Sequence, residues 1–266
     1  MPANTSITDG ATTELRAAAA QAKDVFSRHP APPFPLGVCL ACCMTPEIER
    51  ELREWKPSAL TAHHLYEYNT SAKPPSQSVP ELGHFLPRMF ELMVAGRDIH
   101  HSTELFLVRL GNCPADSWRA DERAAIERFS IALFDVALRG ATLPDTAHPW
   151  TEDPLATLLM FDIGGVAIEP LLVAWLRCEH PASTIQYVES TYWHFWEDET
   201  YSNPFATDRP SFQRRLRDWL LDPECRRVFA ARLLHPDFQE AARMHVADGR
   251  VPFPLVIEAV FDHLTR

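Results

Sequence analysis

Glycine is scarce in this sequence, and its scarcity limits the folds that the chain can adopt. The 266 residues include only 9 glycines beside 23 prolines. Few runs alternate apolar and polar residues, so tight hairpins and sheet edges find little support, whereas proline-marked helix starts are frequent. We therefore expect an all-α protein without significant sheet, either a multi-helix bundle or stacked helical hairpins with about 11 to 13 helices.

Long apolar runs are also missing. No stretch approaches the roughly 20 apolar residues that span a bilayer. The N-terminus lacks the charged start and apolar core of a secretory signal. We expect a cytoplasmic protein without membrane association, with its six cysteines reduced, folded as a single domain over residues 1–266 with residues 1–11 frayed.

Several motifs of common enzyme classes are absent from the sequence. There is no Gly-x-Ser-x-Gly element for a serine nucleophile and no glycine-rich loop that could hold a phosphate. Gly164-Gly165 stands alone between two predicted helices, where it suits a tight turn that lets the helices pack closely. The motifs therefore identify no enzyme.

Basic residues are nearly absent from residues 145–208. This segment has 11 acidic side chains against the single basic Arg177, a net charge of -10, while the whole chain carries -11. Such a segment repels phosphate backbones and speeds encounters with basic surfaces. We therefore expect no nucleic-acid binding and favour a basic protein as partner.

The same segment is rich in aromatic residues. On a helix predicted over residues 182–199, one face should be core, formed by Ile185, Val188, Tyr192, Phe195 and Trp196. Trp193 lies at the flank of this face. Aromatic anchors with surrounding carboxylates are typical of protein interfaces. The predicted partner-binding residues are Glu189, Trp193, Glu197, Asp198, Glu199 and Tyr201.

The leading hypothesis is therefore a non-enzymatic, acidic helical protein that binds a basic protein. An immunity protein that neutralises a bacterial toxin is one protein of this kind. The alternative for the segment is a solvated acidic face over an aromatic core.

Proline and capping residues mark most of the expected helices. Thr45-Pro46 opens a helix through Trp55, and Pro80 opens the strongest amphipathic helix, which contains Pro87 and ends at Gly96. Further helices are expected at 12–28, 58–69, 101–110, 119–139, 154–162 and 166–178, with C-terminal starts at Pro210, Pro223, Pro236 and Pro254. Spacings of roughly 13 residues between the first three of these starts suggest stacked helical hairpins, so a helical-repeat scaffold that binds peptides is a further alternative.

Five histidines gather in one part of the sequence and suggest a metal site. They are His63, His64, His84, His100 and His101. Helical spacing would place His101 and Glu104 on one face, as in bundle proteins that bind iron or manganese. A site for a transition metal would use His84, His101 and Glu104, and no other cofactor is expected; the alternative is that these histidines are hydrogen-bonded or exposed.

Cys39-Leu-Ala-Cys42-Cys43 precedes a predicted helix start, where the helix dipole would lower a thiol pKa. Cys39 and Cys42 would then serve, with the histidines, a metal- or thiol-dependent enzyme. A thioredoxin site is excluded because no strand precedes the motif, and a structural zinc site lacks a second close cysteine pair. The alternative is that these thiols are small apolar side chains.

The string YNTSAK at residues 68–73, followed by FLPR at 85–88 and Glu91-Leu92, resembles a group of uncharacterised bacterial proteins that share YNxSAK…FLPRxxEL. The resemblance spans residues 36–112. It implies a bacterial, helical, cytoplasmic protein and no known activity. Within the string, Asn69, Lys73 and Arg88 are candidate functional residues, with a helix cap, a solvated lysine and an arginine bound to loop carbonyls as their structural alternatives.

Overall fold

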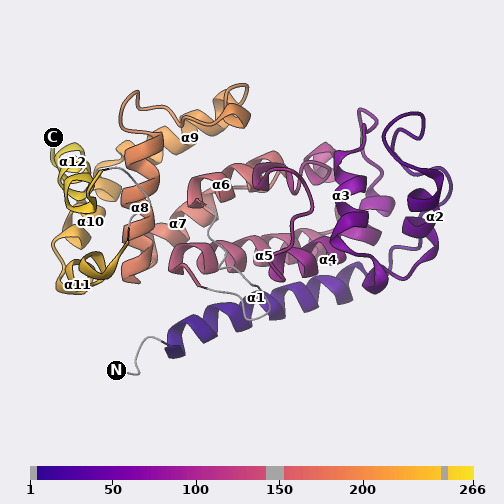
Figure 1. Cartoon of the computed structure of the whole chain (residues 1–266), viewed down its shortest axis with the longest axis horizontal. Helices are drawn as coiled ribbons and strands as arrows, with labels where there is room; N and C mark the ends of the chain where they lie inside the picture. The colour runs from indigo at the N-terminus through magenta and orange to yellow at the C-terminus, as the bar shows by residue number, and fades with distance from the viewer. Residues whose placement is uncertain (1–4, 142–152, 247–250) are drawn as a thin grey trace.

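The computed structural model describes residues 5–141, 153–246 and 251–266, and these ranges confirm the all-α class. They form twelve α-helices and five short 3-10 helices, with no strand in the part described (Figure 1). The α-helices are α1 (Thr5–Phe26), α2 (Pro46–Glu54), α3 (Ala62–Thr70), α4 (Val79–Val94), α5 (Ala120–Arg139), α6 (Pro154–Ile163), α7 (Glu169–Arg177), α8 (Pro181–His194), α9 (Pro210–Leu221), α10 (Pro223–Leu233), α11 (Pro236–Met244) and α12 (Phe253–Thr265).

Proline and side-chain caps start most of these helices, as the sequence predicts. The hydroxyl of Thr45 accepts a hydrogen bond from the backbone N–H of Ile48 at 3.4 Å, and Ser78 caps α4 in the same way through Glu81. Proline lies in the first turn because its missing N–H would have no partner there. The predicted left-handed end of α4 is confirmed at Gly96, with a φ of +61°.

The packing of α1, α4 and α5 forms the first half of the core. Helix α1 lies along both α4 and α5, and the rings of Phe90 and Phe129 stack between α4 and α5 with centroids 3.8 Å apart. Phe85 and Met89 of α4 are fully buried, so the apolar stripe predicted for this helix is core. Helices α6 and α7 pack on α5 of this three-helix group, while α2 lies beside α3 at the end of the molecule (Figure 1).

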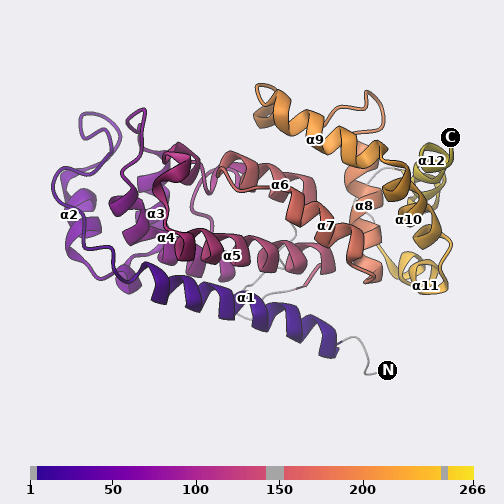
Figure 2. The ribbon, with the colours of Figure 1, turned by 180° about the vertical axis from the view of Figure 1, so that it is seen from behind.

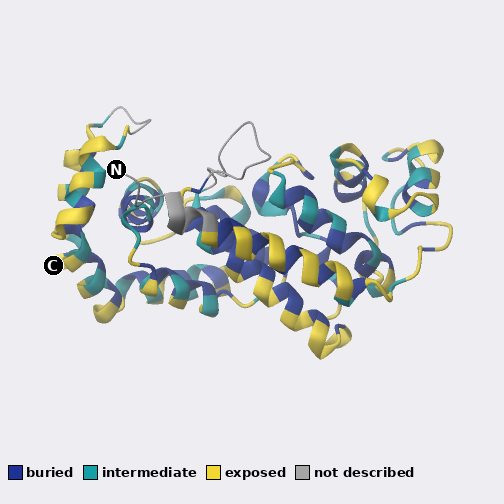
Figure 3. Cartoon of the chain, turned by 90° about the horizontal axis from the view of Figure 1, so that it is seen from below, coloured by how far each residue is buried: buried dark blue, intermediate teal, exposed yellow. Residues whose placement is uncertain are grey.

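Burial differs between the middle of the molecule and its C-terminal end. All ten residues of α6 are buried, whereas Phe238 is the buried residue of α11. Figure 3 shows the same contrast, with exposed and intermediate residues predominating near the C-terminus. Figure 2 shows from behind that α2 and the group α10 to α12 lie at opposite ends of the molecule.

The prediction of a helix over residues 101–110 is wrong. The structure has two short 3-10 helices there, η2 (Thr103–Leu105) and η3 (Leu110–Asn112), with backbone bonds that span three residues. The side-chain amide of Asn69 donates to the carbonyl oxygens of Ile99 and Phe106, at 2.9 and 3.3 Å. The Phe106 carbonyl, which an α-helix would bond to the N–H of residue 110, is thereby held by a side chain of α3.

Four other helix boundaries differ from the prediction. Helix α1 begins at Thr5, earlier than the frayed start had suggested, and α7 begins at Glu169. The predicted helix 58–69 is divided into the 3-10 helix η1 (Pro57–Ala59) and α3. Helix α8 ends at His194, so the carboxylates of residues 197–199 follow the helix and are not part of it.

Among the described residues, no helix is both long and apolar enough to cross a membrane.

Candidate functional site

The end of α8 places one exposed tryptophan beside an aromatic core. Phe195 and Trp196 are buried, and the Trp196 ring stacks on His263 of α12 with centroids 5.0 Å apart. Trp193 keeps 48% of its surface exposed, as its flanking position predicts. A large aromatic side chain is therefore available for contact at the surface.

Two carboxylates follow this tryptophan without an internal partner. Glu197 and Asp198 are exposed, and neither side chain forms an ion pair or hydrogen bond within the described part of the chain. Glu199 behaves differently: its φ is +49°, and its carboxylate lies 2.6 Å from Arg217. Glu199 is thus partly neutralised, whereas its two neighbours keep their charge free.

Glu189 also has an internal partner. The imidazole of His245 lies 2.8 Å from its carboxylate, one helical turn before Trp193 on the same face of α8. This contact brings residues 244–246 to the side of α8 that carries Trp193. Met244 and Val246 are 76% and 85% exposed there.

The prediction that Tyr201 contacts a partner is wrong because its side chain is 3% exposed. The ring packs against Phe212, and the hydroxyl oxygen lies 3.3 Å from the amide nitrogen of Asn203. Burial raises the pKa of Tyr201. Helix α9 fixes its position, because the Tyr201 backbone N–H donates to the side-chain oxygen of Gln213 at 2.9 Å.

Helix α12 adds acidic side chains that sequence reasoning missed. Glu258 and Asp262 are exposed and four residues apart, and neither forms an ion pair within the described ranges. Asp262 precedes His263, which stacks on Trp196 and lies within electrostatic range of Glu199. We call Trp193, Glu197, Asp198, Glu258 and Asp262 the acidic surface.

The predicted metal set is not brought together. His84 lies against α1, with its Nδ1 3.3 Å from the carbonyl oxygen of His29, and burial lowers its pKa. Glu104 instead accepts a hydrogen bond from the Ser102 hydroxyl and another from the side-chain amide of Asn203, the latter at 2.6 Å. His101 and Glu104 line a polar pocket together with Asp98 and His100, but no three potential ligand atoms of these side chains lie within 4.8 Å of one another.

The remaining histidines lie in two pairs, His63 with His64 and His100 with His101, whose ring centroids are 6.2 and 4.2 Å apart. His63 is exposed near Glu67, and His64 is held between Thr61 and a carboxylate of Glu51 at 3.0 Å. Burial lowers the pKa of His100 to about 4. His64 is thus hydrogen-bonded and His63 exposed, the states that the sequence left open as the alternative to a metal site.

The cysteines of this motif do not match the alternative of small apolar side chains. The sulfur of Cys42 lies 3.5 Å from that of Cys39 and 3.4 Å from that of Cys43. The loop is fixed by the backbone N–H of Cys39, which donates to the carbonyl of Ala72 at 2.9 Å, and by the Ser71 hydroxyl, which lies 3.4 Å from the Cys43 carbonyl. These thiols are exposed or half-buried, not core.

A buried polar cluster lies behind the cysteine loop. Arg109 is fully buried and donates to the carbonyls of Tyr68 and Gly37 and to the side chain of Gln77. The Tyr68 hydroxyl donates to Glu81 at 2.8 Å, and the second Glu81 oxygen accepts the Gly37 N–H at 3.0 Å. We call Arg109, Tyr68, Gln77 and Glu81 the arginine cluster; it fastens the start of the cysteine loop to α3 and α4.

Two of the three residues singled out in the YNTSAK string and FLPR, Asn69 and Arg88, form hydrogen bonds within the fold. Asn69 is buried and bonds loop carbonyls, as described above. Arg88 donates to the Leu60 carbonyl at 2.8 Å and to Glu91, which is the role given as its structural alternative. Lys73 is half-buried, and burial lowers its pKa.

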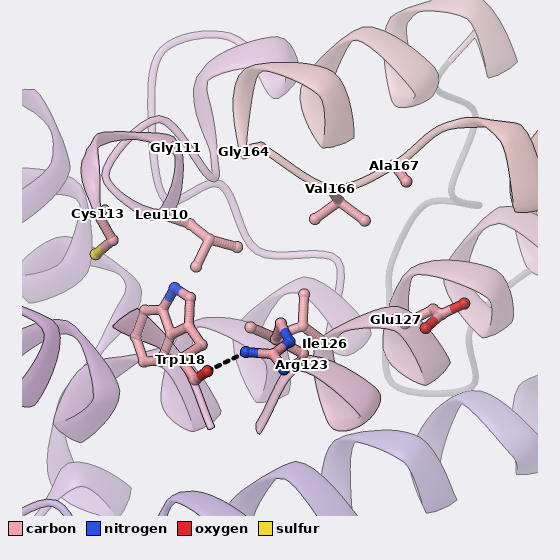
Figure 4. A pocket seen from close by; sticks show the side chains of 11 residues that line it. Leu110, Gly111, Cys113, Trp118, Arg123, Ile126, Glu127, Gly164, Val166 and Ala167 are labelled. Carbon is pink, nitrogen blue, oxygen red and sulfur yellow. Dashed lines mark hydrogen bonds between the residues drawn. The ribbon is translucent and has the colours of Figure 1, made fainter. Parts of the chain in front are cut away.

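A pocket of about 360 Å³ lies beside the turn between α6 and α7 (Figure 4). Leu110, Trp118, Ile126 and Val166 form apolar walls, and Arg123 donates to the Trp118 carbonyl at the rim. Its base is a backbone crossing at which Gly111 lies close to Gly165. The predicted tight turn is present, with a φ of +73° at Gly165, but the close approach at these glycines is to the segment of Gly111, whereas the prediction placed it between the two flanking helices. The pocket can take a small apolar group and contains no paired acid and base.

Comparison with known proteins identifies no relative: no family model matches the chain, and no curated protein or solved structure is significantly similar to it. The resemblance of residues 36–112 to a bacterial group stays a prediction. The function is therefore argued from the residues of the chain itself.

Proposed function

We propose that the protein binds a basic protein partner through the acidic surface. The observation that carries the proposal is the exposed Trp193 beside Glu197 and Asp198, two carboxylates without a partner among the residues that the structure describes. A half-exposed tryptophan offers a large area to bury on binding, and such residues dominate the energy of many interfaces. Free carboxylates around it accelerate the encounter with a positively charged partner.

The surroundings of Trp193 support a contact area larger than one side chain. Met244 and Val246 add exposed apolar surface on the same side of α8. Methionine adapts its shape to a partner because its side chain is unbranched. Glu258 and Asp262 extend the negative charge onto α12.

The partner class is a protein with a basic surface, such as the toxin domain that an immunity protein neutralises. Charge supports this class: residues 145–208 carry -10, and the carboxylates of the acidic surface are not neutralised by neighbouring arginines. The same charge argues against a nucleic-acid partner. Tyr201 is left out of the proposed interface. Glu189 and Glu199 remain in it, each paired within the chain, Glu189 with His245 and Glu199 with Arg217.

The test compares a charge-reversed variant with a matched control. Immobilised protein is exposed to extract of the native host, and the captured partner is identified and its affinity measured for Glu197→Lys/Asp198→Lys and for Asp24→Lys/Glu54→Lys. The control makes the same change in net charge at exposed residues in the last turn of α1 and at the end of α2. We expect the first variant to lose affinity by on the order of tenfold or more and the control to lose little.

Two further readouts separate a specific interface from general charge attraction. Trp193→Ala should weaken binding without changing the salt dependence, because it removes contact area and no charge. Raising the salt concentration should slow association of the unmodified protein. Two results would refute the acidic surface as the binding site: an equal loss of affinity in both charge variants, or an affinity that Trp193→Ala leaves unchanged.

A further inference from the structure

The cysteine loop presents three sulfur atoms to one point in space. Each of the sulfurs of Cys39, Cys42 and Cys43 lies within 4.8 Å of the other two. Three sulfurs bound to one ion at about 2.3 Å would lie roughly 3.8 to 4.0 Å apart. The observed separations of 3.5 and 3.4 Å therefore need only small changes to surround an ion.

From this geometry we propose that Cys39, Cys42 and Cys43 bind a single thiophilic d10 metal ion, Cu(I) or Zn(II), as a three-thiolate site. Soft thiolate ligands select these ions over Mg²⁺, Ca²⁺ or Mn²⁺, which prefer oxygen. Within the described residues this is the one group of three potential ligands that lie so close together. Three thiolates complete the coordination of Cu(I) in a trigonal arrangement, whereas Zn(II) would add a water as its fourth ligand.

The loop is held in place before any ion binds. The backbone N–H of Cys43 donates to the carbonyl of Cys39 at 3.3 Å, which closes the turn that brings the first and third sulfurs together. Ala72 and the arginine cluster fix the start of the loop to α3 and α4. A site whose ligands are already positioned loses less conformational entropy on binding.

Metal binding requires cysteine in its thiolate form. Binding of the ion therefore releases the protons that the three sulfurs carry, so affinity should increase with pH.

The site lies at the α2 end of the molecule, far from the acidic surface at the α12 end (Figure 2). Metal binding and partner binding can therefore be tested separately. Cys42 is exposed and Cys39 and Cys43 are half-buried, so serine at any of the three positions leaves the hydrophobic core intact.

The experiment titrates the reduced full-length chain, without an affinity tag that contains histidine, with Zn(II) and with Cu(I) under anaerobic conditions. The measurements are bound metal per chain after desalting and protection of each cysteine from alkylation, read by peptide mass spectrometry. We expect one ion per chain, protection of Cys39, Cys42 and Cys43, and at least a tenfold loss of affinity in Cys39→Ser, Cys42→Ser and Cys43→Ser.

The matched control is Cys113→Ala/Cys178→Ala/Cys225→Ala, which removes the buried cysteines and should keep the full stoichiometry. Circular dichroism checks that each variant is folded. Binding of either ion with this cysteine dependence supports the proposal. Absence of binding by both ions, or binding that survives Cys42→Ser, would overturn it, as would a Cys39–Cys42 disulfide in a protein that binds no metal after reduction.

Discussion

The arginine cluster and the acidic surface use similar residue types in opposite ways. In the arginine cluster, Arg109 and Glu81 are buried, and their neighbours satisfy them with hydrogen bonds. On the acidic surface, Glu197 and Asp198 are exposed and have no ion-pair or hydrogen-bond partner within the described ranges. A buried charge must be paired to be tolerated, whereas an exposed unpaired charge costs little. The first arrangement therefore serves the fold, and the second is free to serve recognition.

Arg109→Met should produce the largest change in stability. It leaves the Gln77 side-chain oxygen and the Tyr68 carbonyl buried without their donor and removes the positive charge near Glu81, and breaking such an arrangement costs about 3 to 5 kcal/mol of unfolding free energy. Arg88→Met, at a half-buried arginine that bonds Leu60 and Glu91, should cost about 1 kcal/mol. Urea denaturation measures both, and equal losses would remove the distinction between the two arginines.

Met89→Ala should destabilise the protein by about 2 to 5 kcal/mol, because the fully buried side chain leaves a cavity in α4. Val173→Ala removes a comparable apolar group from the exposed side of α7 and should change stability by no more than about 0.5 kcal/mol. Both values come from urea midpoints. A loss below about 1 kcal/mol for Met89→Ala would contradict the packing of the α4 stripe.

Alkylation of Cys39 should show a midpoint near pH 7, since the reactive thiolate is present above the pKa and lost below it. An ordinary cysteine titrates near pH 8.5, so at pH 7 Cys39 should react roughly ten times faster than an unperturbed thiol. Burial raises the pKa of Cys113 to about 12, and this residue serves as the internal slow control. Peptide mass spectrometry after timed alkylation resolves the sites, and equal rates at Cys39 and Cys113 would disprove the assignment.

Glu197→Lys/Asp198→Lys should produce the smallest change in stability, within about 0.5 kcal/mol, because both side chains are exposed and unpaired. Thermal or urea unfolding provides the measurement. A large loss would show that these carboxylates belong to the fold, and would remove the contrast with the arginine cluster.

Local signals predicted most of the helices. Pro46, Pro154, Pro210 and Pro223 each lie in a first helical turn, where the preference depends on a few neighbouring backbone groups. The prediction of a helix over residues 101–110 failed because the side-chain amide of Asn69, more than thirty residues away in the sequence, donates a hydrogen bond to the carbonyl oxygen of Phe106. The pattern of apolar residues within the segment gives no information about a hydrogen bond to such a distant residue.

The candidate site was predictable in its chemistry and less so in its geometry. Trp193 was correctly placed at the surface because its position on α8 follows from helical spacing. The burial of Tyr201 depends on Phe212 and Gln213 of α9, and the carboxylates of α12 are brought near by tertiary packing. The closeness of Cys43 to Cys39 follows from a turn that the CxxC spacing does not specify.

The backbone crossing at Gly111 sets a distance that no side chain can adjust. A methyl group on Gly111 would lie 1.8 Å from the Ile163 carbonyl oxygen, so main-chain atoms of both segments meet directly. Two residues before Gly111 lies Arg109, which holds the cysteine end, and just before Ile163 lies Asp162, which pairs with Arg209 at the start of α9. Main chain has no rotamers through which to relax, so the crossing fixes the distance between the segment that carries Arg109 and the segment that carries Asp162.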